Sequence, residues 1–313
     1  MIEVRDLHKS YRRARGLAGF SMAVEKGEVV GLVGPNGAGK TTLIKTVATL
    51  LRADSGTVRV GDWDVAENPT MVRRMTGYLP DVAGIYQDLR IGEFLDFFAA
   101  AFHVKPSSRR AAVERALDTA GLTDRADEYV EHLSLGWKQR LQLAKTLIHE
   151  PQVLLLDEPA SGLDPLARIA FRDQLKQLRA AGITILVSSH ILADLADVCT
   201  RIVFISDGKE VVEHAEADSG DATVGERKFR CLIEFRENAA AGEIAKKSAG
   251  VRIVETAANR IVADIDGDER NASLLLRALL DSGVVITHFE TKNNDLEARY
   301  VRTFRRASEK APS

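Results

Sequence analysis

A glycine-rich segment at residues 34–42 constrains the fold of this chain more than any other feature. It follows an apolar run at residues 28–33, which predicts a buried strand, and it leads into a helical pattern at residues 41–51. A strand, a glycine-rich turn and a helix, with Lys-Thr at the helix start, make up the G-x-x-x-x-G-K-[ST] arrangement that cradles phosphate groups. The expected phosphate-binding residues are Gly34, Pro35, Asn36, Gly37, Ala38, Gly39, Lys40, Thr41 and Thr42.

The residue types in this loop predict a definite chemistry. Glycines let backbone N–H groups converge on phosphate oxygens, and the start of the helix adds partial positive charge. Lys40 is expected to reach the β- and γ-phosphates, the Thr41 hydroxyl to bind Mg²⁺, and Thr42 to donate a further hydrogen bond to phosphate. A glycine-rich turn with a chance lysine is the alternative, and the flanking strand and helix patterns disfavour it.

A second apolar strand pattern, at residues 153–156, runs directly into two carboxylates. Asp157 is expected to hold Mg²⁺ or its water, and Glu158 to accept a proton from an attacking water molecule. An adjacent Asp-Glu pair is by itself usually a solvated surface. This pair follows a buried strand in the same chain as the phosphate loop, so we interpret it as catalytic.

Length and composition predict the organisation of the chain. At about 150 residues per domain, a length of 313 residues predicts two domains. Strand and helix patterns alternate over the first two thirds, which predicts an α/β domain with a substantially parallel sheet and a mostly helical subdomain at about 88–150. The expected domain spans residues 1–215, with a linker at 216–227, a second domain at 228–304 and a tail at 305–313.

Charge, cysteine content and hydropathy exclude several classes of protein. The 43 Lys+Arg and 45 Asp+Glu leave a formal net charge of -2, which argues against a protein that mainly wraps nucleic acid. The two cysteines lie 32 positions apart, so a disulfide framework or thiolate metal site is not expected, and a reducing cytosolic compartment fits. The N-terminal residues lack the apolar stretch of a signal peptide, and no run approaches the ~20 apolar residues of a membrane span.

The C-terminal third has its own pattern of short strands and helices. Their order, β-α-β-β-α-β, predicts a ferredoxin-like α+β domain. It contains no catalytic constellation, so a regulatory or dimer-supporting module is expected. Its basic end, residues 299–306, is interpreted as a solvated helix end, with contact to anionic lipid headgroups as the alternative. The expected strands are 228–236, 251–255, 260–266 and 284–289, and the expected helices are 239–249, 272–281 and 296–304.

Residues 133–140 read Leu-Ser-Leu-Gly-Trp-Lys-Gln-Arg, which resembles the signature sequence of the ATP-binding cassette (ABC) family. Other segments match that family in order. Residues 77–81 (GYLPD) fall where its Q-loop lies, residues 161–164 (SGLD) look like its D-loop, and His190 in Ser-Ser-His looks like its switch histidine. The resemblance covers roughly residues 1–215. It implies a P-loop cassette fold, with a mixed sheet core plus a helical subdomain, that binds ATP with Mg²⁺.

The resemblance also implies that two copies pair head to tail around ATP. Ser134 and the backbone N–H of Gly136 would then bind the γ-phosphate of the partner's ATP, and His190 would contact the γ-phosphate and help to place the water. Asp164 would align the two copies, with a helix cap as an alternative or additional role. Tyr11, 29 residues before Lys40, would stack on adenine, unless it is simply a surface aromatic.

Three departures from the family pattern bear on activity. Asp81 stands where the family has Gln, and its carboxylate keeps an oxygen ligand for Mg²⁺ or a catalytic water. Leu135 and Trp137 replace a Gly and a Gln of the signature, whereas Gly136, whose backbone must approach phosphate, is kept. We therefore expect retained ATP hydrolysis.

The Q-loop and signature variants, with a small C-terminal domain, resemble the ABC-2-type export branch. In that branch the cassette docks on a separately encoded integral membrane permease, so a cytoplasmic protein, peripheral on the inner face of the cell membrane, is expected. Residues 84–98 are the candidate contact surface, with internal packing as the alternative. No nucleic acid partner is expected.

Two other functions compete with transport. A soluble ABC ATPase acting on nucleic acid or the ribosome normally needs two cassettes or long coiled-coil arms, and here the interval from Lys40 to Ser134 is only 94 residues. A nucleotide-binding regulator without turnover would agree with the altered signature and Q-loop. Glu158 and His190 argue against that alternative.

Overall fold

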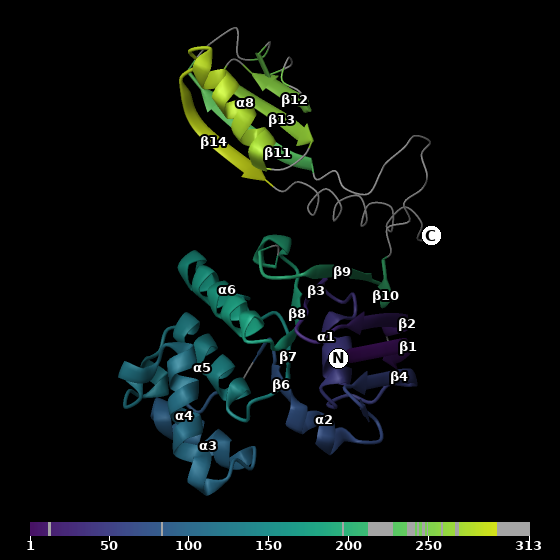
Figure 1. Cartoon of the computed structure of the whole chain (residues 1–313). Coiled ribbons are helices and arrows are strands. Elements are labelled where there is room, and N and C mark those ends of the chain that lie inside the picture. The colour runs from purple at the N-terminus through teal and green to yellow at the C-terminus, as the bar shows by residue number, and fades with distance from the viewer. Residues whose placement is uncertain are drawn as a thin grey trace. The chain divides into compact units, whose positions relative to one another are not determined.

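A computed structural model gives the fold of two compact units, Met1–Val212 and Glu213–Ser313, which are described separately (Figure 1). The described residues are 1–11, 14–82, 84–195, 197–211, 228–236, 242, 244–245, 248, 250–257, 259–266 and 269–292.

A six-stranded sheet forms the centre of the first unit (Figure 1). Its order is β10-β9-β3-β8-β7-β6, and all neighbours run parallel except β10, which is antiparallel to β9. Every residue of β3 and β7 is buried, which explains why both read as continuous apolar runs. The strands are β3 (Val29–Val33), β6 (Thr76–Leu79), β7 (Val153–Leu156), β8 (Thr184–Ser189), β9 (Arg201–Ser206) and β10 (Lys209–Glu210).

A second, antiparallel sheet of order β2-β1-β4-β5 flanks the six-stranded sheet. The sequence patterns did not predict this second sheet. Its two long strands pair with several register shifts, which break the simple alternation on which a sequence prediction depends. Apolar side chains such as Ile2, Leu7 and Phe20 pack into one core with Leu43 and Ile44 of the first helix. The strands are β1 (Ile2–Tyr11), β2 (Ala14–Val24), β4 (Ser55–Val60) and β5 (Trp63–Asp64).

Helix α1 (Lys40–Val47) follows the glycine-rich loop and ends four residues earlier than predicted. Thr49 adopts a left-handed backbone with φ of 64°, and the N–H groups of Leu50 and Leu51 both donate to the Lys45 carbonyl. This closing turn ends the helix because a left-handed residue cannot continue the right-handed spiral. Strand β8 is in turn longer than predicted, since it includes Ser188 and Ser189.

The segment expected to be helical, about 88–150, contains three helices with a core of their own (Figure 1). Helices α3 (Ile91–Ala101), α4 (Pro106–Ala120) and α5 (Leu135–Leu147) bury Phe94, Leu117 and Leu141 between them. The remaining helices of this unit are the short α2 (Pro69–Met75) and the long α6 (Pro165–Ala180). A 3-10 turn, η3 (Leu192–Asp194), follows β8.

The second unit contains an antiparallel sheet of order β12-β13-β11-β14 and the helix α8 (Glu269–Asp281). In a β-α-β-β-α-β chain this order places the first and third strands in the centre, which agrees with the predicted ferredoxin-like arrangement. Helix α8 begins three residues before its predicted start, and the last strand is shifted toward the C-terminus. The strands are β11 (Lys228–Phe235), β12 (Val251–Ala257), β13 (Arg260–Asp266) and β14 (Ile286–Lys292).

Some predicted segments lie outside the described residues. These are the linker at 216–227, the helix at 296–304 with the basic end, the tail at 305–313 and most of the helix at 239–249. Within the described ranges, no helix combines the length and the apolar character needed to cross a membrane.

Candidate functional site

The predicted phosphate and carboxylate residues meet at one edge of the six-stranded sheet. Strands β3, β8 and β7 are parallel neighbours, so their carboxyl ends lie side by side. Strand β3 leads to Gly34, β7 leads to Asp157, and β8 ends just before His190. The crevice outside the carboxyl ends of such strands is where open α/β sheets bind their ligands.

The glycine-rich loop packs so closely at Gly34 and Gly39 that neither position can carry a side chain. A Cβ at Gly34 would lie 2.2 Å from the carbonyl oxygen of Ile205, and a Cβ at Gly39 would lie 2.3 Å from that of Gly16. Gly39 also has a φ of 112°, which favours glycine. The loop tip, residues 35–37, is exposed, so the backbone there is open to a ligand.

Lys40 holds the loop in shape from inside. Its Nζ donates hydrogen bonds to the carbonyl oxygens of Gly34, at 2.7 Å, and Pro35, at 3.2 Å. The same nitrogen lies 3.2 Å from Oε1 of Glu158, in an ion pair whose lysine side chain is only 6% exposed. The loop therefore carries a buried positive charge next to the predicted catalytic carboxylate.

Asp157 joins the first helix to two strand ends. Its Oδ1 accepts hydrogen bonds from the Thr41 hydroxyl, at 3.0 Å, and from the Ser188 hydroxyl, at 2.8 Å. Burial raises the pKa of Asp157, the two hydrogen bonds oppose that rise, and the charges of Asp81 and Glu158 add to it. The hydroxyl of the exposed Thr41 and the carboxylate of the buried Asp157 thus lie together, and both are oxygen ligands that suit a cation.

Glu158 and His190 form a pair beside this cluster. The Nδ1 atom of His190 lies 2.7 Å from Oε2 of Glu158, and the His190 backbone N–H donates to the same oxygen at 3.2 Å. The other oxygen, Oε1, is buried and accepts no hydrogen bond, although Lys40 lies within ion-pair distance. Glu158 has a left-handed backbone, with φ of 48°, and its N–H donates to Ser188 Oγ at 2.9 Å.

Asp81 and Tyr11 lie at the rim of the same site. Asp81 is exposed. Burial raises the pKa of Tyr78 to about 12, and the charges of Asp157 and Asp81 add to that rise. The Tyr11 ring is 47% exposed and its hydroxyl lies 3.3 Å from the Thr42 hydroxyl, next to the start of α1. An aromatic face beside the phosphate loop is thus available for stacking.

The signature residues lie on the helical segment, away from the edge that carries Gly34 and Asp157. Ser134 is exposed at the N-terminus of α5. Gly136 faces α6, because a Cβ there would lie 2.9 Å from Cβ of Ala167. Asp164 caps α6, since its carboxylate accepts a hydrogen bond from the Ala167 N–H at 2.9 Å. The capping alternative for Asp164 is therefore present in the structure.

Comparisons with known proteins decide the family. The family model described as ABC transporter matches residues 17–161. Nod factor export ATP-binding protein I of Burkholderia orbicola is 37% identical over 214 residues, covering 68% of this chain and 70% of that protein. The chain belongs to the ABC transporter ATP-binding proteins. The family resemblance predicted from the signature and loops is therefore confirmed.

Further relatives and a solved structure agree with the assignment of this chain to the ABC ATP-binding proteins. The linearmycin resistance ATP-binding protein of Bacillus subtilis is 31% identical and covers 70% of each chain. The daunorubicin resistance ATP-binding protein of Streptomyces coeruleorubidus is 30% identical over 302 residues, covering 96% of this chain and 94% of that one. A solved ATP-binding subunit of an ABC transporter is 31% identical with a TM-score of 0.60, covering 68% of this chain and 88% of that one. The ABC ATPase fold and nucleotide binding follow for this chain.

In this ABC ATP-binding protein, Trp137 of the altered signature contacts its own subdomain. Two guanidinium groups stack on its ring, with the Arg125 Cζ at 4.8 Å and the Arg140 Cζ at 4.6 Å from the ring centre. Arg125 is itself fixed by two hydrogen bonds to Glu128, at 2.9 and 2.7 Å. The stack therefore anchors the first turn of α5, where Ser134 and Gly136 lie.

Replacing Trp137 with Gln, the residue usual in the family, is expected to lower the free energy of unfolding by about 1–3 kcal/mol, because two cation–π contacts and part of the buried ring area are lost. Replacement with Phe should cost less, since an aromatic ring remains for the two guanidinium groups. Urea unfolding followed by far-ultraviolet circular dichroism measures both changes. An unchanged midpoint for the Gln variant would show that the stack contributes no stability.

Sequence reasoning missed Ser188, which bonds both Asp157 Oδ1 and the Glu158 N–H. A signal was available, because Ser-Ser-His follows an apolar run that ends at the same sheet edge. Serine in a buried strand position needs a hydrogen-bond partner, and Ser188 is fully buried.

Proposed function

We propose that this ABC ATPase hydrolyses ATP in a head-to-tail dimer and so drives export through a separately encoded membrane permease. One observation carries the hydrolytic part of the proposal. Glu158 presents a buried carboxylate oxygen that accepts no hydrogen bond, beside the Lys40 amine and the Thr41–Asp157 pair. A buried carboxylate oxygen that accepts no hydrogen bond can take the proton of a water molecule, which is the task of a general base.

The residues around the loop fit a nucleoside triphosphate with its magnesium ion. Backbone N–H groups of the loop and Lys40 would hold the phosphates, while Thr41 and Asp157 would hold Mg²⁺, with Asp81 at the rim as a further ligand or a partner for its water. Mg²⁺ is commonly bound by one or two carboxylates together with the phosphates of a substrate. The ion would neutralise charge that develops on the phosphates.

Glu158 and His190 have different roles toward the attacking water and the γ-phosphate. Glu158 Oε1 would take a proton from the water as its oxygen attacks the γ-phosphorus, while the bond from that phosphorus to the bridging oxygen breaks and ADP leaves with that oxygen. His190 is held through Nδ1 and its backbone N–H by Glu158 Oε2, so its other ring nitrogen is left to contact the γ-phosphate. Tyr11 would stack on the base and Thr42 would donate to phosphate.

The exposure of Ser134 supports the head-to-tail dimer. Ser134 and the N–H of Gly136 lie at the start of α5, where unpaired backbone donors and the helix dipole favour an anion. In the proposed dimer they meet the γ-phosphate held by the other copy, and Asp164 lies between the two.

A mixing experiment tests this composite site. Lys40→Met and Ser134→Arg variants should each be nearly inactive as pure proteins. An equal mixture should recover about a quarter of the wild-type phosphate release, because half of the dimers are mixed and each has one intact site of two. Subunit exchange is checked by labelling the two variants with different fluorophores. If dimers exchange and no activity returns, the head-to-tail arrangement is wrong.

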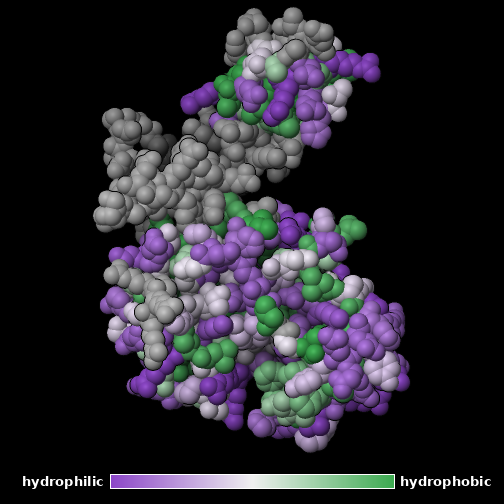
Figure 2. Space-filling view, turned by 180° about the vertical axis from the view of Figure 1, so that it is seen from behind, coloured by the Kyte–Doolittle hydropathy of each residue, from purple (hydrophilic) through white to green (hydrophobic). Residues whose placement is uncertain are grey.

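The contact surface at residues 84–98 is partly core and partly exposed. Ile91 and Phe94 are fully buried and pack internally, whereas Tyr86 and Phe97 are 52% and 49% exposed with ring centres 5.5 Å apart. Figure 2 shows an apolar, pale green area at the lower end of the larger unit, at the height of α3 in Figure 1. We assign the exposed pair to permease binding on the cytoplasmic side. The relatives named for Nod factor export and drug resistance support export as the direction.

A further inference from the structure

Arg168, in the first turns of α6, touches two loops of the proposed active site. Its Nε donates a hydrogen bond to the carbonyl oxygen of Leu163 in the D-loop, at 3.1 Å. Its Nη1 lies 3.9 Å from Oδ1 of Asp194, in the loop that follows His190. No motif singled out this residue, and the proposed chemistry does not use it.

On the D-loop side, Arg168 belongs to a well-bonded turn. The backbone N–H of Arg168 donates to the Asp164 carbonyl oxygen at 3.0 Å, and the Asp164 carboxylate caps the Ala167 N–H. With the Nε bond to Leu163, the helix start and the end of the D-loop are held as one unit. A displacement of the D-loop would therefore move the Arg168 guanidinium.

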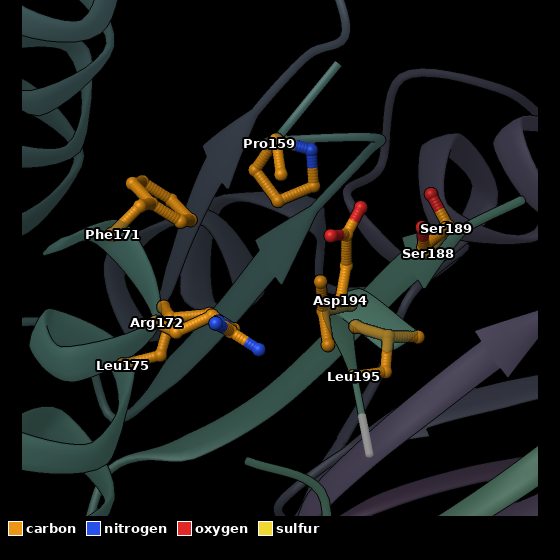
Figure 3. Close-up of a pocket in the computed structure, with 10 residues that line it drawn as sticks. Pro159, Phe171, Arg172, Leu175, Ser188, Ser189, Asp194 and Leu195 are labelled. Carbon is orange, nitrogen blue, oxygen red and sulfur yellow. The ribbon is translucent and has the colours of Figure 1, made fainter. Parts of the chain in front are cut away.

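On the other side, Asp194 is a carboxylate with little access to water. Its side chain is 12% exposed and lies in η3, four residues after His190. Burial raises the pKa of Asp194, and the charges of Arg168, Arg172 and His190 oppose that rise. A buried carboxylate needs a counter-charge, and Arg168 lies within ion-pair distance of Asp194. Figure 3 shows Asp194 lining a small cavity with Arg172 of α6 and Pro159.

The loop between His190 and Asp194 is short and internally bonded. The Ser189 hydroxyl and the backbone of Ile191 bond each other, with both distances at 3.0 Å, and Asp194 N–H donates to the Ile191 carbonyl oxygen at 3.2 Å. His190 is fixed at its other end by Glu158. A displacement of Asp194 would therefore also displace the His190 imidazole, because the loop between them is fixed by these bonds.

We propose that Arg168 is a positioning residue that couples the D-loop to the loop of His190. The inference rests on the proposed ATP hydrolysis and adds a means by which the D-loop, at the dimer contact, sets the place of His190 and with it of Glu158. Arg168 donates to the D-loop carbonyl of Leu163, and the neighbouring Arg172 lies 3.5 Å from the exposed Asp197. Coupling through Arg168 needs both of its contacts.

Steady-state ATP hydrolysis by full-length variants tests the coupling. Arg168→Met removes both contacts and should lower kcat about 10- to 100-fold while KM changes less than about 2-fold, because small misplacements of catalytic groups act mainly on the chemical step. Arg168→Lys keeps the charge opposite Asp194 without the planar donor to Leu163, so an intermediate kcat is expected. Asp194→Asn should resemble Arg168→Met, and the double variant should be no worse than either. Lys176→Met, which removes an exposed ion pair on the same helix, is the matched control.

Amide hydrogen exchange without nucleotide gives a readout that does not depend on turnover. Arg168→Met should speed exchange in residues 190–195, and Lys176→Met should not. A merely structural role would lower thermal stability without the split between kcat and KM. Unchanged exchange at residues 190–195, or unchanged kcat in an active protein, overturns the inference. Wild-type protein without phosphate release would instead overturn the proposed function, while the exchange result still decides the coupling.

Discussion

Glu158→Gln is expected to lower the turnover number for ATP hydrolysis by about 10²- to 10⁴-fold, the usual contribution of a general base. The amide has nearly the shape of the carboxylate, so the backbone at residue 158 and the neighbouring His190 keep their places. It cannot take a proton from water. Nucleotide binding should persist, because the loop and Lys40 are expected to supply the contacts to phosphate.

Phosphate release and fluorescent-nucleotide affinity, measured on the same samples, separate these effects. Glu114→Gln, which removes an exposed carboxylate paired with Arg110 on α4, should leave both measurements at the wild-type level. A Glu158→Gln variant with turnover within a factor of two of wild type would exclude Glu158 as the base. Weakened binding with unchanged kcat would instead assign Glu158 to holding Lys40.

Lys40→Met is expected to weaken ATP binding about 10- to 100-fold, since hydrogen bonds to charged groups contribute about 1.5–3 kcal/mol each. The apolar replacement has a similar length but removes the donor to the Gly34 and Pro35 carbonyl oxygens. It also leaves the Glu158 carboxylate without its ion pair, at a site where that carboxylate is 13% exposed. The Lys40→Met variant therefore alters both the geometry of the phosphate loop and the charge beside Glu158.

Isothermal titration with ATP and with AMP distinguishes the phosphate contribution from base stacking. Lys40→Met should lose affinity for ATP and little for AMP, because Lys40 is expected to reach only the outer phosphates. Lys45→Met, on an exposed position of the same helix, is the control for a general effect on α1. Equal losses for the two nucleotides would contradict the proposed position of Lys40.

The phosphate loop and the two strands that lead to Gly34 and Asp157 were predictable because each is a local pattern. Residues 29–33 and 153–156 have no polar side chain on either face, and the structure buries every residue of β3 and β7. The fold class followed from the alternation of such local patterns over the first two thirds of the chain. The family followed from several short motifs and from their order along the chain.

The parts that escaped prediction depend on contacts between distant residues. Asp157 takes hydrogen bonds from Thr41 and Ser188, which lie 116 and 31 positions away along the chain. The pairing of β1 with β2 is local, but register shifts hide its alternation. Packing also decided which apolar side chains of residues 84–98 are core, since Phe94 is buried and Phe97 is half exposed although both are phenylalanines on one helix.

The left-handed backbone of Glu158 costs conformational free energy at the position of the proposed general base. A non-glycine residue with a φ of 48° costs about 1–2 kcal/mol relative to a relaxed backbone, a cost that glycine would not bear. Glycine at this position would relieve the backbone cost, but it would also remove the carboxylate that pairs with the buried Lys40. Efforts to make the ATPase more heat-resistant should accordingly leave position 158 untouched and take their gains elsewhere in the molecule.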